Sequence, residues 1–327
     1  MSPRPFPNGV YCPLTTPFKA QTEEVDYDAL KTQVVRLAKA RCGIVLLGTN
    51  GEASHLSDTE RTSIITAART ALTAANFPDT ALLVGTGTGS ARETVKLCNE
   101  AKAAGADYAI VIPPGYFAFA IGKNREALKS YFWEVLDKSE VPVMIYNFPG
   151  ASAGIDLDSD ILVELSEHQN CFGAKLTCGG IGKGHRLSIH TQSAEYKKRH
   201  PTPFIVMPGF SDILLPSMIA LSSGCITGTG NIIPKTIVKL YDVAEEALRT
   251  GSLEKLREAQ ALQEIVSLAD WAIVKAGIGG TKYALDTYVQ AGLGGVPRSP
   301  LPIAGQEIHA LLARDLVRAV EFEKSLP

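Results

Sequence analysis

A lysine, a tyrosine and a threonine each stand at the end of a short apolar run, and together they could carry out imine chemistry. Lys175 lies within "FGAKLTCGG", an otherwise uncharged stretch in which Phe172, Ala174, Leu176 and Cys178 would wall the amine. Burial disfavours the charged form of an amine, and an uncharged amine attacks ketones to form a Schiff base. We therefore expect Lys175 to be a nucleophile. The alternative is a lysine that extends its ammonium group into solvent or binds a phosphate.

Tyr146 in "MIYNFPG" and Thr49 in "LLGTNGE" supply hydroxyl groups at comparable places. A Schiff base needs a proton shuttle to dehydrate its carbinolamine, and a phenol hydrogen-bonded to a second hydroxyl can serve as one. The alternative for Tyr146 is a rim aromatic with its hydroxyl in water. Gly48 and Gly51 around Thr49 and Asn50 would leave backbone N–H groups exposed for a substrate carboxylate. Their alternative role is an ordinary tight turn.

Eight short β-branched or apolar runs, separated by segments of helical periodicity, must position these groups. The expected strands are 9–18, 43–48, 81–87, 107–114, 141–149, 171–177, 203–209 and 225–231. The clearest expected helices are 27–39, 57–75, 91–104 and 125–136, and "SDTE" at 57–60 predicts a capping box. Strict alternation indicates a parallel sheet, and eight units predict closure into an α/β TIM (β/α)8 barrel. Working residues of such barrels lie at the carboxyl ends of strands, where Thr49, Tyr146 and Lys175 are expected.

The expected domain organisation is a barrel over residues 1–233, which carries the Schiff-base site, and a helical C-terminal extension over 234–327 packed on it. A competing fold is a doubly wound sheet with a dinucleotide site, suggested by "VGTGTGS" at 84–90. Its glycines are spaced GxGxG instead of GxGxxG, and they follow the third expected strand instead of the first. A tight turn is therefore the preferred interpretation.

Composition and charge indicate a protein that acts on a small molecule. Apolar residues make up 45% of the chain, charged residues 20%, and the formal net charge is -2, so bulk electrostatics favours neither nucleic acid nor an anionic membrane as partner. The opening "MSPRPFPNG" lacks the apolar core of a secretion signal. A mitochondrial presequence is rich in arginine, but Arg4 is the only arginine before the first expected strand, so we expect a cytoplasmic protein. The six cysteines and six histidines show no CxxC, HxH or HExxH spacing, so no metal site is expected.

Five short motifs in register resemble those of the dihydrodipicolinate synthase / N-acetylneuraminate lyase family, which are class I aldolases that handle pyruvate. They are "GTNGE" (48–52), "PPGYF" (113–117), "YNFPG" (146–150), "GAKLT" (173–177) and "TGTGNIIP" (227–234). The resemblance spans essentially the whole chain. It implies that Lys175 forms the Schiff base, that Tyr146 is the general acid and base, and that Thr49 with Asn50 binds the carboxylate of a 2-oxo acid.

The resemblance also implies an assembly. Tyr116 is similar to the family tyrosine that reaches into a neighbouring subunit's site, in the tight dimer of a homotetramer built as a dimer of dimers. Gly209 falls in the segment that lines the substrate pocket. No metal or organic cofactor is implied, because the lysine itself is the electron sink.

Two departures from the family pattern bear on the substrate. Members that condense pyruvate with aspartate semialdehyde carry an arginine two residues after the motif proline, whereas here Pro149 is followed by Gly150 and Ala151. Asn50 stands where those members have a second threonine. The chain therefore resembles fungal 2-keto-3-deoxy-L-galactonate (L-threo-3-deoxy-hexulosonate) aldolases, which implies cleavage of a 2-keto-3-deoxy sugar acid to pyruvate and an aldehyde. Dihydrodipicolinate synthase, 4-hydroxy-2-oxoglutarate aldolase and a silent keto-acid-binding protein stay as alternatives.

The segment 179–200 is longer than such a barrel needs before its seventh strand. It carries Lys183, His185, Arg186 and His190 near the expected mouth, where they could bind a sugar hydroxyl or a carboxylate. A run of charges beside a loop is more often a solvated face, and we favour that interpretation.

Overall fold

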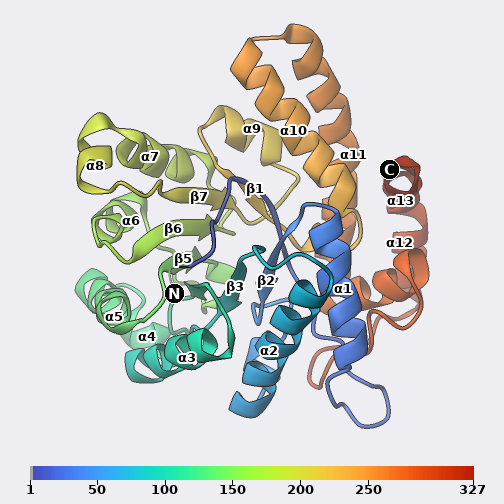
Figure 1. Ribbon diagram of the computed structural model, residues 1–327, viewed down its shortest axis with the longest axis horizontal. Coiled ribbons are helices and arrows are strands. Elements are labelled where there is room, and N and C mark those ends of the chain that lie inside the picture. The colour runs from blue at the N-terminus through green and yellow to red at the C-terminus, as the bar shows by residue number, and fades with distance from the viewer. Residues whose placement is uncertain (1–2) are drawn as a thin grey trace.

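Eight parallel strands form the centre of the molecule in the computed structural model, which describes residues 3–327 (Figure 1). The strands are β1 (Gly9–Pro13), β2 (Gly43–Leu46), β3 (Leu82–Gly85), β4 (Tyr108–Val111), β5 (Val143–Asn147), β6 (Cys171–Leu176), β7 (Ile205–Pro208) and β8 (Gly224–Ile226). Each overlaps one expected run. Their spatial order, β7-β6-β5-β4-β3-β2-β1-β8, follows the chain, and the Ser223 N–H donates to the Val206 carbonyl at 2.8 Å between the two ends. The predicted (β/α)8 barrel with C-terminal helices is confirmed.

Helices surround the barrel and continue beyond its last strand. They are α1 (Tyr27–Lys39), α2 (Asp58–Ala74), α3 (Ala91–Ala104), α4 (Ala118–Ile121), α5 (Arg125–Lys138), α6 (Ser159–Ser166), α7 (Ile181–Gln192), α8 (Ala194–Arg199), α9 (Leu214–Ile219), α10 (Pro234–Thr250), α11 (Leu253–Ala284), α12 (Gln306–Asp315) and α13 (Val317–Ser325). Short helical turns are η1 (Ala53–His55), η2 (Pro149–Ala151), η3 (Gly228–Asn231) and η4 (Leu285–Val289). The capping box is confirmed, because Ser57 and Glu60 each accept the other's backbone N–H.

The helices after β8 gather on one side of the barrel, next to α1 (Figure 1). Val10 and Cys12 of β1 share one apolar cluster with Ile237 and Leu240 of α10, so α10 packs directly on the sheet. The division of the chain at residue 233 stays a prediction. Within residues 3–327, no helix is both long and apolar enough to cross a membrane.

An irregularity in β6 decides which way its side chains face. The register of β6 against β5 shifts by one residue between Cys171 and Gly173, so Phe172 and Gly173 both face the barrel interior. Regular alternation then resumes. It turns Ala174 toward the helices and Lys175 toward the interior. Without the extra residue, Lys175 would have faced the helices.

Candidate active site

Three of the predicted residues meet at the carboxyl ends of β2, β5 and β6. Tyr146 and Lys175 are register partners on adjacent strands, and Lys175 Nζ lies 4.3 Å from the centroid of the Tyr146 ring. The Thr49 hydroxyl lies 3.4 Å from the Tyr146 phenol oxygen, within reach of a long hydrogen bond. Lys175 is 5% exposed and Tyr146 7%, whereas Thr49 is exposed. The structure thus brings an amine, a phenol and a solvent-facing hydroxyl together, with the phenol in contact with both of the others.

The predicted apolar wall around Lys175 is largely wrong. Ala174, Leu176 and Cys178 pack in the cluster between the sheet and the helices, because strand alternation turns them away from the amine. Only Phe172 faces the barrel interior. The face of the Tyr146 ring covers Lys175 instead, in a cation–π arrangement. The amine makes no hydrogen bond to any of the described residues 3–327, so it is not engaged elsewhere.

The turn after β2 has the unpaired donors expected of a carboxylate site. Neither the Thr49 N–H nor the Asn50 N–H donates a hydrogen bond within the described part of the chain. The Asn50 side chain lies against Gly228, where an added Cβ would be 2.6 Å from Asn50 Nδ2. A glycine is therefore needed at 228 for this approach. Two backbone donors and a side-chain amide are available to an anion at this turn.

Gly209 lies beside a residue that the sequence analysis missed. An added Cβ at Gly209 would lie 1.9 Å from the Thr177 hydroxyl oxygen, so a larger residue would displace Thr177. Thr177 is 8% exposed, and its hydroxyl has no hydrogen-bond partner among residues 3–327. The sequence did offer a signal for Thr177. Side chains two positions apart on a strand face the same side, and Thr177 follows Lys175 by two positions.

Tyr116 is not brought to these residues within one chain. Its side chain is 84% exposed, and its ring packs edge-on against Phe117 with centroids 5.0 Å apart. Phe117 and Phe119 are 52% and 88% exposed. The three aromatic side chains form an exposed patch on the segment between β4 and α5.

A buried carboxylate that the sequence analysis also missed ties together the loops after β7 and β8. Asp270 of α11 is 2% exposed, and its Oδ1 accepts hydrogen bonds from the hydroxyls of Ser211 at 2.7 Å, Thr227 at 2.9 Å and Thr229. Burial and the nearby Asp270 charge raise the pKa of Asp212 to about 6. No sequence signal marked Asp270, which occupies an ordinary position in a helical pattern.

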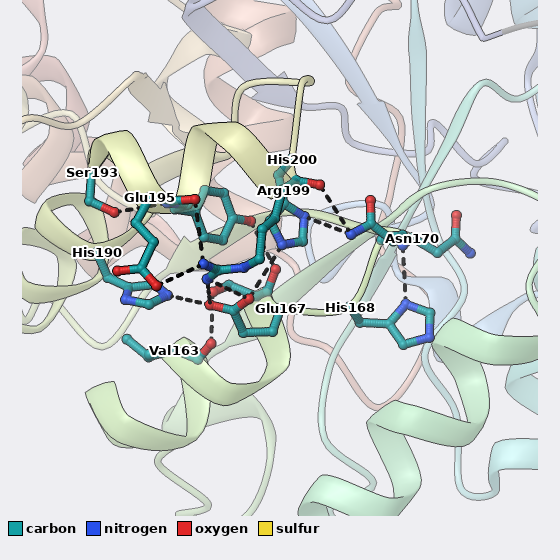
Figure 2. Close-up of polar contacts among 12 residues, drawn as sticks. Val163, Glu167, His168, Asn170, His190, Ser193, Glu195, Arg199 and His200 are labelled. Carbon is teal, nitrogen blue, oxygen red and sulfur yellow. Dashed lines mark hydrogen bonds and ion pairs between the residues drawn. The ribbon is translucent and has the colours of Figure 1, made fainter.

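The segment 179–200 forms helices α7 and α8, in which Lys183, His190 and Arg199 pair with carboxylates and Arg186 donates to the Ser159 hydroxyl at 2.8 Å. Lys183 contacts Asp156. Figure 2 shows His190, Arg199 and His200 converging on Glu167. His190 Nε2 lies 2.7 Å and Arg199 Nη2 2.9 Å from Glu167 Oε1. Partial burial alone would raise the pKa of Glu167, but hydrogen bonds from these three side chains outweigh it and lower the pKa.

Comparisons with known proteins place the chain among relatives of similar length. The model of the dihydrodipicolinate synthetase family matches residues 6–317. An L-threo-3-deoxy-hexylosonate aldolase of Hypocrea jecorina is 38% identical over 327 residues, with 100% of both chains covered. A protein of Emericella nidulans described as "Probable 4-hydroxy-2-oxoglutarate aldolase, mitochondrial" is 40% identical over 327 residues, with 100% of this chain and 99% of the relative covered. A solved structure of a Coccidioides immitis protein assigned to the dihydrodipicolinate synthase family is 32% identical, with a TM-score of 0.84 and both chains covered completely.

Proposed function

Since this chain belongs to the dihydrodipicolinate synthetase family, we propose that it is a class I aldolase that cleaves a 2-keto-3-deoxy sugar acid to pyruvate and an aldehyde. One observation carries the proposal. The unengaged amine of Lys175 lies 4.3 Å from the ring of Tyr146, whose phenol lies 3.4 Å from the Thr49 hydroxyl. A nucleophile, a proton donor and acceptor, and a relay hydroxyl are the groups that imine formation and aldol cleavage require.

The proposed mechanism begins with the substrate carboxylate on the Thr49–Asn50 turn. The Lys175 amine attacks the C2 carbonyl to give a carbinolamine. Tyr146 then protonates the carbinolamine hydroxyl, which leaves as water and gives an iminium ion. Tyr146, as phenolate and in contact with Thr49, then removes the proton of the C4 hydroxyl. The C3–C4 bond breaks, its electrons flow into the iminium to give an enamine, and the aldehyde leaves. Protonation at C3 and hydrolysis release pyruvate and restore the amine.

The residues around the motif proline support a sugar-acid substrate over aspartate semialdehyde. Ala151 occupies the place where the synthases carry an arginine for the second carboxylate, and it lies at the end of the exposed turn η2. A methyl group offers no charge to a second carboxylate. A coupled assay with pyruvate and aspartate semialdehyde should therefore show little or no turnover.

A second candidate activity is 4-hydroxy-2-oxoglutarate cleavage, which the name of the 40% identical relative suggests. It would use the same imine and give pyruvate and glyoxylate. Pyruvate release from a panel of keto-deoxy sugar acids and from 4-hydroxy-2-oxoglutarate separates the two activities. Stabilisation of the protein by keto acids without turnover on any member of the panel would favour a silent binding protein instead.

The test of the imine is reduction with borohydride in the presence of pyruvate. We expect the reduced pyruvyl adduct on Lys175, identified by mass spectrometry of the digested protein. Lys282 is an internal control, because it is 1% exposed and its Nζ already donates to the Val296 carbonyl at 2.7 Å. A label on another lysine, or no label with any keto acid, would contradict the proposed function.

We also propose that the chain forms a homotetramer in which the partner subunit's Tyr116 completes each site. The exposed patch of Tyr116, Phe117 and Phe119 supports it, because such large aromatic surfaces mark interaction sites. Light scattering should give the mass of four chains, and Phe119→Asp should lower it. An unchanged mass for Phe119→Asp would remove this patch from the interface. A cytoplasmic location stays a prediction.

A further inference from the structure

The turn that carries Thr49 and Asn50 is bounded by two residues in an unfavourable backbone conformation. Leu47 has a φ of 56° and Glu52 a φ of 51°, both in the left-handed region that residues other than glycine rarely adopt. Such conformations persist only where surrounding contacts enforce them, and they concentrate at functional sites. Contacts from outside the turn must therefore hold it in place.

The side chain of Glu52 provides those contacts from a fully buried position. Its Oε2 accepts a hydrogen bond from the Arg298 N–H at 2.9 Å and lies 3.0 Å from His55 Nδ1. Its Oε1 lies 2.5 Å from Nζ of Lys282, so the carboxylate and the ammonium group form a direct ion pair. The side chains of Glu52 and Lys282 are 0% and 1% exposed, which shields the attraction from solvent.

Lys282 reaches the turn from the last turn of α11, in the part of the chain that follows the barrel strands. Its Nζ donates to the Val296 carbonyl at 2.7 Å and lies 4.4 Å from the centroid of the Phe18 ring. Burial lowers the pKa of Lys282 to about 8, although the Glu52 carboxylate opposes the shift. The protein thus keeps an ammonium group where burial disfavours its charge.

Stability alone gives little reason to retain this pair. Replacing both partners of a buried ion pair by uncharged residues of similar volume is often neutral or stabilising, whereas removing one partner leaves an uncompensated charge. What the pair does supply is a fixed direction for Glu52, whose own N–H donates to the Thr49 carbonyl at 3.0 Å. Only Gly51 separates Glu52 from Asn50.

We propose that Glu52 and Lys282 are positioning residues of the active site, which hold the Thr49–Asn50 turn in the conformation that binds the carboxylate of the 2-oxo acid. The helices after the barrel are in that case part of the active site, through one lysine. This inference rests on the function proposed above, because it concerns binding of the same keto acid.

The experiment compares Lys282→Met with the double variant Glu52→Gln/Lys282→Met. Met keeps much of the lysine's length, and the double variant removes both charges, so its stability should return to near that of the unmodified protein. Lys275→Met is the matched control, because Lys275 also lies in α11, before the break at Gly277, and pairs with Asp315 at 3.2 Å on the surface. For each protein we would measure the melting temperature and the pyruvate concentration that gives half-maximal borohydride labelling of Lys175.

We expect Lys282→Met to raise the half-saturating pyruvate concentration by about tenfold. A change of this size corresponds to the loss of one well-placed interaction with the substrate carboxylate. The maximal labelling rate should fall by less than the half-saturating concentration rises. The double variant should keep the raised value although its melting temperature recovers to within about 3 °C of the unmodified protein. The control should match the unmodified protein in both measurements.

An unchanged half-saturating concentration in the single and double variants would overturn the inference and leave the pair a structural contact. Recovery of pyruvate binding together with stability in the double variant would overturn it as well. These outcomes differ from failure of the proposed function, in which the unmodified protein itself takes up no label.

Discussion

The two ends of the barrel use aromatic and charged residues in opposite ways. At the amino end, Phe6 stacks on Tyr11 with ring centroids 4.2 Å apart and packs edge-on against Tyr108 and Phe172 at 5.2 Å. At the carboxyl end, the Tyr146 ring covers a lysine that has no hydrogen bond to the described residues. The amino end is closed by aromatic side chains that pack on each other. The carboxyl end presents an amine that is free to bind a ligand.

The polar groups show a related difference. At the amino end, Asp107 is paired with Arg4 at 2.9 Å and with Arg69 at 2.6 Å, and it also accepts the Leu82 N–H. At the carboxyl end, the Thr177 hydroxyl and the Thr49 and Asn50 N–H groups have no partner among residues 3–327. An unpaired buried hydroxyl such as that of Thr177 costs stability unless a ligand satisfies it, and the N–H groups of the exposed Thr49 and the half-buried Asn50 are free to bind a ligand at the same end. The comparison predicts that changes at the carboxyl end affect activity and changes at the amino end affect stability.

The largest expected effect is that of Lys175→Met. Removing the nucleophile should lower the rate of pyruvate release by about 10⁴-fold or more, because no other described amine lies beside Tyr146. Lys183→Met is the matched control, since Lys183 lies in α7 shortly after β6 but is paired with Asp156. Steady-state assays at equal protein concentration measure both variants. Substantial activity in Lys175→Met would break the comparison at its most important point.

A pair of tyrosine variants tests the two ends with the same chemical change. Tyr146→Phe should lower kcat by about 10²- to 10³-fold, because it removes the proton shuttle. Tyr108→Phe removes only a 2.7 Å hydrogen bond to the Arg4 carbonyl, so it should cost about 1 kcal/mol of stability and leave kcat unchanged. Kinetics and urea unfolding on both proteins give the contrast. Equal kcat values in the two variants would show that the phenol of Tyr146 is not a catalytic group.

Phe6→Ala should act on stability alone. The half-buried Phe6 ring fills the amino end of the barrel, so we expect its loss to lower the free energy of unfolding by about 2 kcal/mol. The activity per folded molecule should not change. Urea denaturation and a kinetic assay below the transition measure the two quantities. A several-fold loss of activity in the folded protein would show that the amino end also shapes the site.

The smallest expected effect concerns Glu167, whose ordinary pKa of 4.5 is lowered in the folded protein. A carboxylate with a lowered folded-state pKa contributes stability above its unfolded pKa and loses that contribution as pH falls through the folded pKa. At pH 7, Glu167→Gln should therefore have a lower free energy of unfolding than the unmodified protein. The difference should be under about 1 kcal/mol, because Glu167 and its partner Arg199 are partly exposed. The difference should disappear as the pH is lowered below 4.5. A difference that persists in acid would indicate packing instead of charge.

The sequence by itself determined the strand and helix order, the capping box at Ser57 and the placement of Lys175 at the end of a strand. These features depend on local alternation and on neighbouring residues, which a single chain displays directly. The same strand-end pattern indicated Tyr146 and the Thr49–Asn50 turn, and the family motifs assigned roles to these residues. The carboxyl ends of parallel strands meet at one face, so a barrel assignment was enough to expect them together.

Only the tertiary structure decided which side of β6 the amine faces and what surrounds it. The one-residue register shift at Phe172 is a property of the pairing between β5 and β6, and no local pattern revealed it. Glu52 meets Lys282 across most of the chain, and Asp270 meets Thr227 across 43 residues, through contacts that depend on how α11 packs on the mouth loops. Local sequence sets the period of a strand or helix, whereas the partner of a buried charge is set by the closure of the whole barrel.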